Sequence, residues 1–195
     1  MPSPAPLILA STSAYRRMLL DRLGVGFSVE APGVEETHLP GEAPRARAAR
    51  LAAAKAHAVA ARHPQAVVIG SDQVACTGQM ILEKPGEAKV AREQLARMSG
   101  GVAEFHTACA VVCTREAFSA AHLDTTRAVF RLLTPEEIDR YIARERPFDC
   151  AASFKVESLG ISLLERVESA DPTGVIGLPL IWIAATLRRL GYQVP

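Results

Sequence analysis

The sequence has few aromatic residues, few cysteines and almost no net charge. Its 195 residues include four cysteines, one tryptophan and 5% aromatic residues, and the formal net charge is +1. A charge this small argues against non-specific binding to nucleic acid or to a membrane surface, and no basic stripe with interleaved aromatics marks a nucleic-acid module. No apolar stretch reaches the roughly 18 residues of a membrane span. We therefore expect neither a nucleic acid nor a membrane as partner.

The cysteines follow no metal-binding or redox pattern. Cys76, Cys109, Cys113 and Cys150 show neither a CxxC motif nor a Cys/His ligand spacing. Cys109 and Cys113 lie in a β-like run, where a separation of four residues places their Cα atoms about 13 Å apart, too far for a disulfide. We interpret all four as small buried apolar residues in a reducing compartment. The N-terminal run also lacks the basic region of a signal peptide, so a cytoplasmic location is expected.

A single domain is expected over residues 1–195. Apolar residues make up 49% of the chain and charged residues 22%, which is the balance of an ordinary globular protein. A chain of this length buries roughly 70% of the surface that its unfolded form exposes, so it needs no disulfide or structural metal to fold. Neither an internal repeat nor a low-complexity linker divides it. This leaves one domain, with one lobe or two.

Strands and helices are expected to alternate along the chain. Continuous apolar runs such as 66–70 predict central strands covered on both faces. A capping box at Thr134, with proline at the next position, predicts a helix start. The expected strands are 7–10, 27–31, 66–70, 105–113 and 123–132, with a hairpin near 77–78, and the expected helices are 14–23, 44–62, 87–98, one from 134 and 180–190. The pattern predicts a mixed α/β fold, with a bent sheet flanked by helices and a cleft between two lobes.

A polar turn between the first strand and the first helix could bind an anion. Ser11 opens this turn, and Arg16 and Arg17 lie in the first turn of the helix. Free backbone N–H groups and the helix dipole attract anions at such a place. Two arginines there are electrostatically unfavourable unless a negative ligand binds. An ordinary capped helix with solvated arginines explains this segment equally well.

Acidic residues that follow strands are candidate metal ligands or bases. Asp72 follows the apolar run that ends at Gly70, and ligands of α/β sheets gather at the carboxyl ends of strands. Glu35 and Glu36 follow the second strand, and hard oxygen ligands of this kind suit Mg²⁺ or Mn²⁺. Taken singly, Asp72 could merely begin a turn, and exposed loop acids are the simpler explanation of the two glutamates.

Three lysines stand in unusual surroundings. Lys55 interrupts an alanine-rich helix, Lys84 is followed by Pro85, and Lys155 follows Phe154. The proline restricts the backbone at Lys84. Each lysine alone is most simply a solvated surface residue, so their value lies in their occurrence together.

These segments also form an ordered set of motifs. The order is Ser-Thr-Ser-x-Tyr-Arg-Arg from 11, Glu-Glu-Thr from 35, Arg-Leu-Ala-x-x-Lys-Ala from 50, Gly-Ser-Asp-Gln-Val from 70 and Lys-Pro-Gly from 84, continued by 97–100, 130–134, 150–155 and 177–181. This order resembles the Maf family of nucleotide pyrophosphatases, and the resemblance covers nearly the whole chain.

The resemblance implies an enzyme that hydrolyses a nucleoside triphosphate to the monophosphate and pyrophosphate with Mg²⁺ or Mn²⁺. It also implies a fold related to inosine triphosphate pyrophosphatases and often a homodimer. Asp72 would be the catalytic acid/base residue and would hold the metal with Glu36. A carboxylate with an ordinary pKa near 4 is a weak base at neutral pH, so metal polarisation of the water must supply much of the activation. Lys55 and Lys84 are expected to join Asp72 and Glu36 as catalytic residues by clamping the phosphates, and the expected substrate-binding residues are Ser11, Arg16, Arg17 and Lys155.

Three positions separate the branches of the resembled family: Tyr15, Gln73 and Glu157. An aromatic residue, Gln and Glu there resemble the branch that acts on 7-methyl-GTP, whereas the thymidine and uridine triphosphate branch carries Arg, Thr and Gln. N7-methylguanine is cationic, and an aromatic face attracts a cation by roughly 0.5–2 kcal/mol. The carboxylate of Glu157 could accept hydrogen bonds from guanine N1–H and its amino group. The alternatives are that Tyr15 is a half-buried helix residue, that the enzyme is a pyrimidine or promiscuous pyrophosphatase, or that the chain is a non-catalytic nucleotide-binding regulator of cell division.

Three positions depart from the resembled family. Ala152 and Ser158 stand where glycine is usual, and Glu83 stands where this branch commonly has glycine. If Ala152 or Ser158 requires a positive φ, its side chain could narrow the pocket or shift the loop.

Overall fold

A mixed sheet runs through the whole molecule. The computed structural model describes residues 4–195, and within them seven strands form one sheet in the order β2-β1-β3-β5-β6-β7, with β4 paired to β3. The strands are β1 (Leu7–Ala10), β2 (Ser28–Glu30), β3 (Val67–Thr77), β4 (Met80–Ile81), β5 (Val102–Cys113), β6 (Phe118–Phe130) and β7 (Leu164–Glu168). The pairings of β1 with β2 and β3 are parallel, and those among β3, β5, β6 and β7 are antiparallel.

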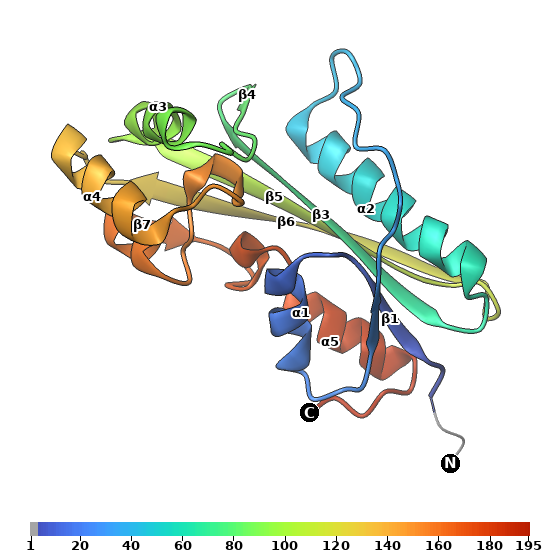
Figure 1. Cartoon of the computed structure of the whole chain (residues 1–195). Helices are drawn as coiled ribbons and strands as arrows, with labels where there is room; N and C mark the ends of the chain where they lie inside the picture. The colour runs from blue at the N-terminus through green and yellow to red at the C-terminus, as the bar shows by residue number, and fades with distance from the viewer. Residues whose placement is uncertain (1–3) are drawn as a thin grey trace.

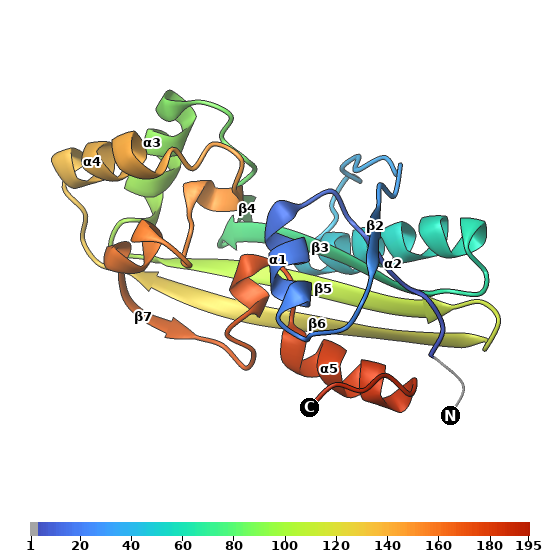
Figure 2. The ribbon, with the colours of Figure 1, turned by 60° about the horizontal axis from the view of Figure 1, so that its bottom comes forward.

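Helices cover both faces of this sheet (Figures 1 and 2). They are α1 (Ala14–Asp21), α2 (Pro44–Arg62), α3 (Ala88–Met98), α4 (Pro135–Glu145), α5 (Leu180–Arg189) and the short 3-10 turns η1 (Ala151–Ser153), η2 (Leu159–Leu163) and η3 (Gly174–Ile176). On one face, α2 packs Ala56 and Val59 against Ile8 and Val68. On the other face, α1 and α5 share an apolar cluster with β1, β3 and β5. The expected mixed α/β fold with flanking helices is therefore confirmed.

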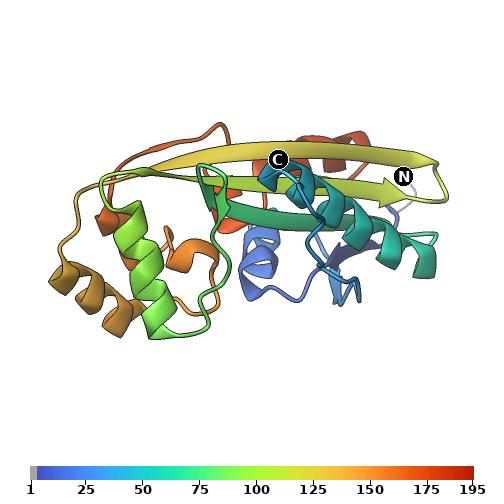
Figure 3. The same ribbon diagram turned by 90° about the horizontal axis from the view of Figure 1, so that it is seen from above.

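The described residues form four apolar clusters along the long strands. One core surrounds Phe105, Phe130 and Phe154 and includes residues of α3 and α4. The other clusters contain residues of α1, α2 and α5. Figure 3 shows α3 and α4 at one end of the sheet, with β5 and β6 extending past them toward α2. None of the helices within residues 4–195 combines the length and apolarity needed to cross a membrane.

Local sequence signals account for several boundaries. The hydroxyl of Thr134 accepts a hydrogen bond from Glu137 N at 3.3 Å, and Glu137 Oε2 accepts one from Thr134 N at 2.9 Å, so the capping box is confirmed. The hairpin near 77–78 is also confirmed, because Thr77 pairs with Met80 across a turn in which Gly78 has a φ of 56°. A positive φ of this kind favours glycine.

The strand that contains Asp72 is longer than its apolar run predicts. β3 continues to Thr77, and Asp72 pairs with Ala108 of β5 inside the sheet, so the expectation that Asp72 lies just past the strand end is wrong. Polar side chains can continue this strand because β5 supplies ladder partners along one edge, which apolar periodicity does not reveal. For a similar reason, β7 and the start of β6 at Phe118 were not predicted.

Candidate active site

The candidate site lies along an unpaired stretch of β3. β1 pairs with β3 only as far as Ala10 opposite Gly70, and β4 pairs only with Cys76 and Thr77. Among residues 4–195, no strand pairs with the edge of β3 that faces β1 and β4 over residues 71–75. A cavity of about 600 Å³ lies there, with Asp72, Gln73 and the two residues after them in its wall. Its size is that of a small-molecule pocket.

Most of the residues predicted from the sequence converge on this cavity. Its lining includes Ser11, Tyr15, Arg16, Glu36, Lys55, Asp72, Gln73 and Lys84. A second cavity of about 120 Å³ shares Tyr15, Gln73 and Lys84 with the first and adds Glu157. Arg17 is exposed and Lys155 is half-buried, and neither lines these two cavities. The substrate-binding roles of Arg17 and Lys155 stay predictions.

Close packing of α2 on β3 places Lys55 beside Asp72. A Cβ added to Gly70 would lie 2.5 Å from Ala56 N, 2.9 Å from Ala56 Cα and closer still to Ala52 O. Only glycine therefore permits this approach. One helical turn of α2 includes Lys55, whose Nζ lies 2.6 Å from Asp72 Oδ1 and 2.6 Å from Glu36 Oε1.

The two carboxylates that share Lys55 have opposite pKa shifts. Burial raises the pKa of Asp72, and Lys55 and Arg16 only partly offset this. Burial also acts to raise the pKa of Glu36, but the hydrogen bond from Lys55 and the positive charges of Lys55, Arg16 and Lys84 together outweigh it, so the pKa of Glu36 is lowered. The difference follows from exposure, because the side chain of Asp72 is 8% exposed and that of Glu36 is 55% exposed.

Asp72 and Glu36 have the chemistry to hold a divalent cation. Lys55 Nζ contacts one oxygen of each, so Asp72 Oδ2 and Glu36 Oε2 remain for another ligand. Mg²⁺ is usually bound through one or two carboxylates, with substrate phosphates and waters completing its shell. The residues present therefore fit such a cation.

Positively charged side chains lie near the turn between β1 and α1. Arg16 Nη1 lies 3.4 Å from Ser11 Oγ, and Arg16 Nε donates to Gly177 O at 3.1 Å, which holds the guanidinium at the cavity wall. Both Arg16 and Lys84 act electrostatically on Glu36. No acidic residue occupies the first turn of α1, so its N–H groups and dipole add to a site suited to an anion.

Sequence reasoning missed three charged residues of this cavity: Arg47, Glu83 and Asp149. Arg47 Nη1 donates to Glu83 Oε1 at 2.6 Å, and His38 Nε2 lies 2.7 Å from the same oxygen. Although burial acts to raise it, these partners hold the pKa of Glu83 below its usual range. The only sequence signal was the departure from glycine at Glu83, since Arg47 reads as one of several helix arginines.

The second cavity is built around Tyr15. The Tyr15 hydroxyl donates to Asp149 Oδ2 at 3.2 Å, and Lys155 Nζ lies 5.9 Å from the ring centroid. Burial, reinforced by Cys150, raises the pKa of Tyr15 to about 12, so the phenol stays neutral. Cys150 is half-buried rather than buried as expected, because it lines this cavity, where its Sγ lies 3.7 Å from the Tyr15 hydroxyl oxygen.

Gln73 is fixed by a different set of contacts. Its Nε2 donates to Thr107 Oγ1 at 2.9 Å and to the carbonyls of Gly174 and Val175 at 3.1 and 2.9 Å. With the amino group engaged in this way, the side-chain oxygen is the group left to accept a hydrogen bond from a ligand.

Two of the three departures from glycine, Ala152 and Ser158, differ in their backbone conformation. Ala152 has a φ of 58° and is fully buried, so it adopts the left-handed conformation that glycine tolerates best. Ser158 has a φ of −136° and does not require glycine.

The sequence comparisons agree with the motif order. A family model described as Maf-like protein matches residues 6–190. The chain belongs to this Maf-like family. A protein of Xanthomonas campestris pv. campestris named 7-methyl-GTP pyrophosphatase is 52% identical over 189 residues, covering 97% of this chain and 98% of its own. A Polaromonas protein of the same name is 50% identical over 190 residues, covering 97% of this chain and 87% of its own. A solved structure of the Staphylococcus aureus Ham1 protein aligns with a TM-score of 0.45 at 14% identity, covering 64% of this chain and 71% of that one.

Proposed function

We propose that this Maf-like protein is a nucleoside triphosphate pyrophosphatase that converts 7-methyl-GTP to 7-methyl-GMP and pyrophosphate. The observation that carries the proposal is the cavity along β3, where Asp72, Glu36 and Lys55 face the cationic end of α1. The names of relatives about half identical over nearly the full chain support the same substrate.

In the proposed reaction, a water molecule attacks the α-phosphorus and the bond to the oxygen that bridges the α- and β-phosphates breaks. Asp72 would accept the proton of the water, and its raised pKa makes it a stronger base than an ordinary aspartate. A divalent cation held by Asp72 and Glu36 would supply charge neutralisation and a more acidic water. Arg16, Lys84 and Ser11 would hold the phosphates in line with this water.

The second cavity supports the choice of base. Tyr15 offers an aromatic face, and the carboxylates of Asp149 and Glu157 line the same space. An aromatic face with nearby negative charge suits a cationic ring such as N7-methylguanine. Lys155 does not cancel this preference, because Asp149 lies 3.5 Å and Glu145 4.0 Å from its ammonium group.

The decisive experiment compares pyrophosphate release from 7-methyl-GTP, GTP, UTP and dTTP, each with Mg²⁺ and with Mn²⁺. We expect the highest kcat/KM for 7-methyl-GTP. Tyr15→Leu should lower kcat/KM for 7-methyl-GTP by roughly 2- to 30-fold more than for GTP, which lacks the ring charge. A preference for UTP would overturn the choice of base and favour a pyrimidine pyrophosphatase.

The catalytic role is tested separately. Asp72→Asn should lower kcat by roughly 10²- to 10⁴-fold while nucleotide binding persists. Near-normal turnover in this variant would refute the role of Asp72. A wild-type protein that binds nucleotide and metal without hydrolysis would instead be a regulator.

A cytoplasmic location and a homodimer also belong to this proposal. The four cysteines, all in the described part of the chain, are free thiols, in keeping with a reducing compartment. Light scattering of the purified protein tests the dimer.

A further inference from the structure

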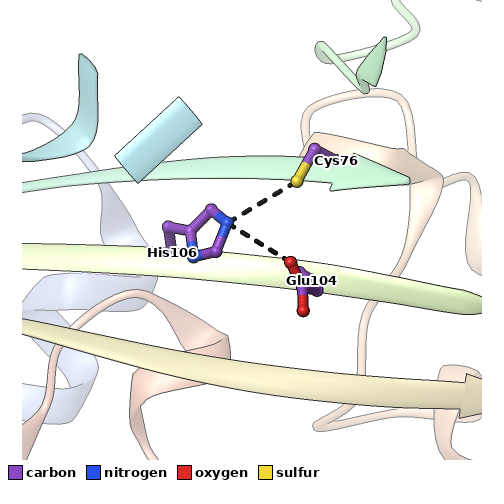
Figure 4. Close-up of side chains that lie close together, drawn as sticks. All are labelled: Cys76, Glu104 and His106. Carbon is purple, nitrogen blue, oxygen red and sulfur yellow. Dashed lines mark hydrogen bonds and ion pairs between the residues drawn. The ribbon is translucent and has the colours of Figure 1, made fainter. Parts of the chain in front are cut away.

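Three side chains of types that can bind a metal ion lie close together outside the two cavities. The ligand atoms of Cys76 on β3 and of Glu104 and His106 on β5 all lie within 4.8 Å of one another. Figure 4 shows the thiol and the carboxylate directed at the same nitrogen of His106. None of the three lines either cavity described above, and the proposed hydrolysis does not use them.

The sheet register explains why these residues meet although 30 positions separate Cys76 from His106. Cys76 is paired with Glu104, and Val74 with His106. Directly opposite residues of antiparallel strands project from the same face, and so do residues two apart along one strand. The thiol, the imidazole and the carboxylate therefore share one face of the sheet, which linear Cys/His spacing cannot reveal.

The two distances to His106 Nε2 are close to those around a tetrahedral zinc ion. Cys76 Sγ lies 3.6 Å from His106 Nε2, and Glu104 Oε2 lies 3.7 Å from the same nitrogen. Zinc binds sulfur at about 2.3 Å and nitrogen or oxygen at about 2.0–2.2 Å, so tetrahedral ligands stand about 3.4–3.6 Å apart. These two separations therefore need to change by only a few tenths of an ångström, and the thiol and the carboxylate, which lie within 4.8 Å of each other, would close around the ion.

The surrounding residues orient two of the three ligands. His106 Nδ1 lies 3.0 Å from Thr125 Oγ1, and donation from Nδ1 to this hydroxyl leaves the lone pair of Nε2 directed at Cys76 and Glu104. Arg127 approaches the other carboxylate oxygen, Glu104 Oε1, at 3.6 Å. Cys76 and His106 are buried, whereas the Glu104 side chain is 39% exposed and provides a route of entry.

We propose that Cys76, Glu104 and His106 bind one Zn²⁺, with water as the fourth ligand. On binding, a zinc–sulfur bond replaces the S–H bond of Cys76 and the proton leaves to solvent. The thiolate and the carboxylate together balance the charge of the ion. A thiolate and an imidazole select Zn²⁺ over Mg²⁺, so this site is chemically distinct from the cleft. It joins β3 to β5 about 13 Å along the strand from Asp72.

Cobalt is the test probe, because only a thiolate ligand gives a sulfur-to-metal charge-transfer band. The protein is first stripped of metal with a chelator and placed in excess Mg²⁺, which occupies the proposed cation site at Asp72 and Glu36. It is then titrated with Co²⁺ and afterwards with Zn²⁺. We expect the band to saturate at one equivalent of Co²⁺ and to disappear as Zn²⁺ displaces it. The absence of this band in the wild-type protein would overturn the proposal.

Single-residue variants test whether the charge-transfer band comes from Cys76. Cys76→Ala should abolish the band, whereas Cys150→Ala and Cys113→Ala, which alter other thiols, should retain it. Thr125→Val keeps the shape of the side chain and should weaken Co²⁺ binding roughly 10- to 100-fold. A band that survives in Cys76→Ala would refute the assignment. If Cys76→Ala does not fold, unchanged Co²⁺ affinity in Thr125→Val would refute it instead.

Discussion

Gly70→Ala should damage both stability and catalysis, because this glycine sets the distance between α2 and β3. The added Cβ would meet backbone atoms of Ala52 and Ala56, at 2.5 Å from Ala56 N. Backbone cannot rotate away as a side chain can, so α2 must shift by about 1 Å to restore ordinary contact distances. Overpacking of this kind costs about 1–3 kcal/mol, and each kcal/mol lowers the Tm of a domain of this size by about 2–4 °C.

The same shift carries Lys55 away from Asp72, with which it now makes a 2.6 Å contact. A displacement of about 1 Å in a catalytic group can cost about 10²-fold in rate. Thermal unfolding and pyrophosphate release from 7-methyl-GTP measure the two effects on the same sample. Gly26→Ala is the matched control, because its added Cβ would have no atom of residues 4–195 within 4 Å other than those of its own residue and its chain neighbours. If Gly70→Ala had the same Tm and the same turnover as Gly26→Ala, the conclusion that close packing of α2 on β3 positions Lys55 would be refuted.

Two further predictions concern the carboxylate pair and the strained turn. Since Lys55 lowers the pKa of Asp72 and Glu36 raises it, Lys55→Met should move the acid limb of kcat/KM to higher pH and Glu36→Gln should move it lower. Activity is lost as pH falls through the pKa of the base, and an acid limb that stays in place in both variants would exclude Asp72 as that base. Ala152→Gly should change stability by less than about 1 kcal/mol, because relief of about 1–2 kcal/mol of left-handed strain is offset by a lost buried methyl and a more flexible unfolded chain. Ala152→Val, β-branched in the same conformation, should lower the Tm clearly, and equal Tm values for the two variants would contradict the strain.

The sequence predicted best where a local signal sets the structure. The alanine-rich run between Pro44 and Arg62 forms one helix with the predicted bounds, since its residues are strong helix formers and Pro64 follows it. The ordered motifs likewise identified residues most of which line one cavity. The bounds of the helix depend on residues that are close together in the chain. The site residues were found because the whole ordered set of motifs resembles one family.

Features that depend on tertiary partners were missed. Asp72 looked like a residue beyond a strand end because β5, which extends the strand, pairs with it from more than 30 residues away. Glu83 looked like a mild departure from glycine, yet it accepts hydrogen bonds from both Arg47 and His38 across the cavity. Cross-strand neighbours and long-range ion pairs leave no periodic trace in the sequence, so only the folded chain reveals them.

In the proposed reaction, Asp72 and Glu36 would have different roles, because their surroundings differ although both contact Lys55. Both contact Lys55 at 2.6 Å, so the ammonium group alone cannot distinguish them. Burial makes the difference: it raises the pKa of Asp72, whereas the pKa of the exposed Glu36 is lowered. A carboxylate with a raised pKa is the better proton acceptor, and one with a lowered pKa stays ionised as a constant ligand. Gly70 permits the close approach of α2, whose Lys55 contacts both carboxylates, so the proposed difference in their roles would depend on this glycine.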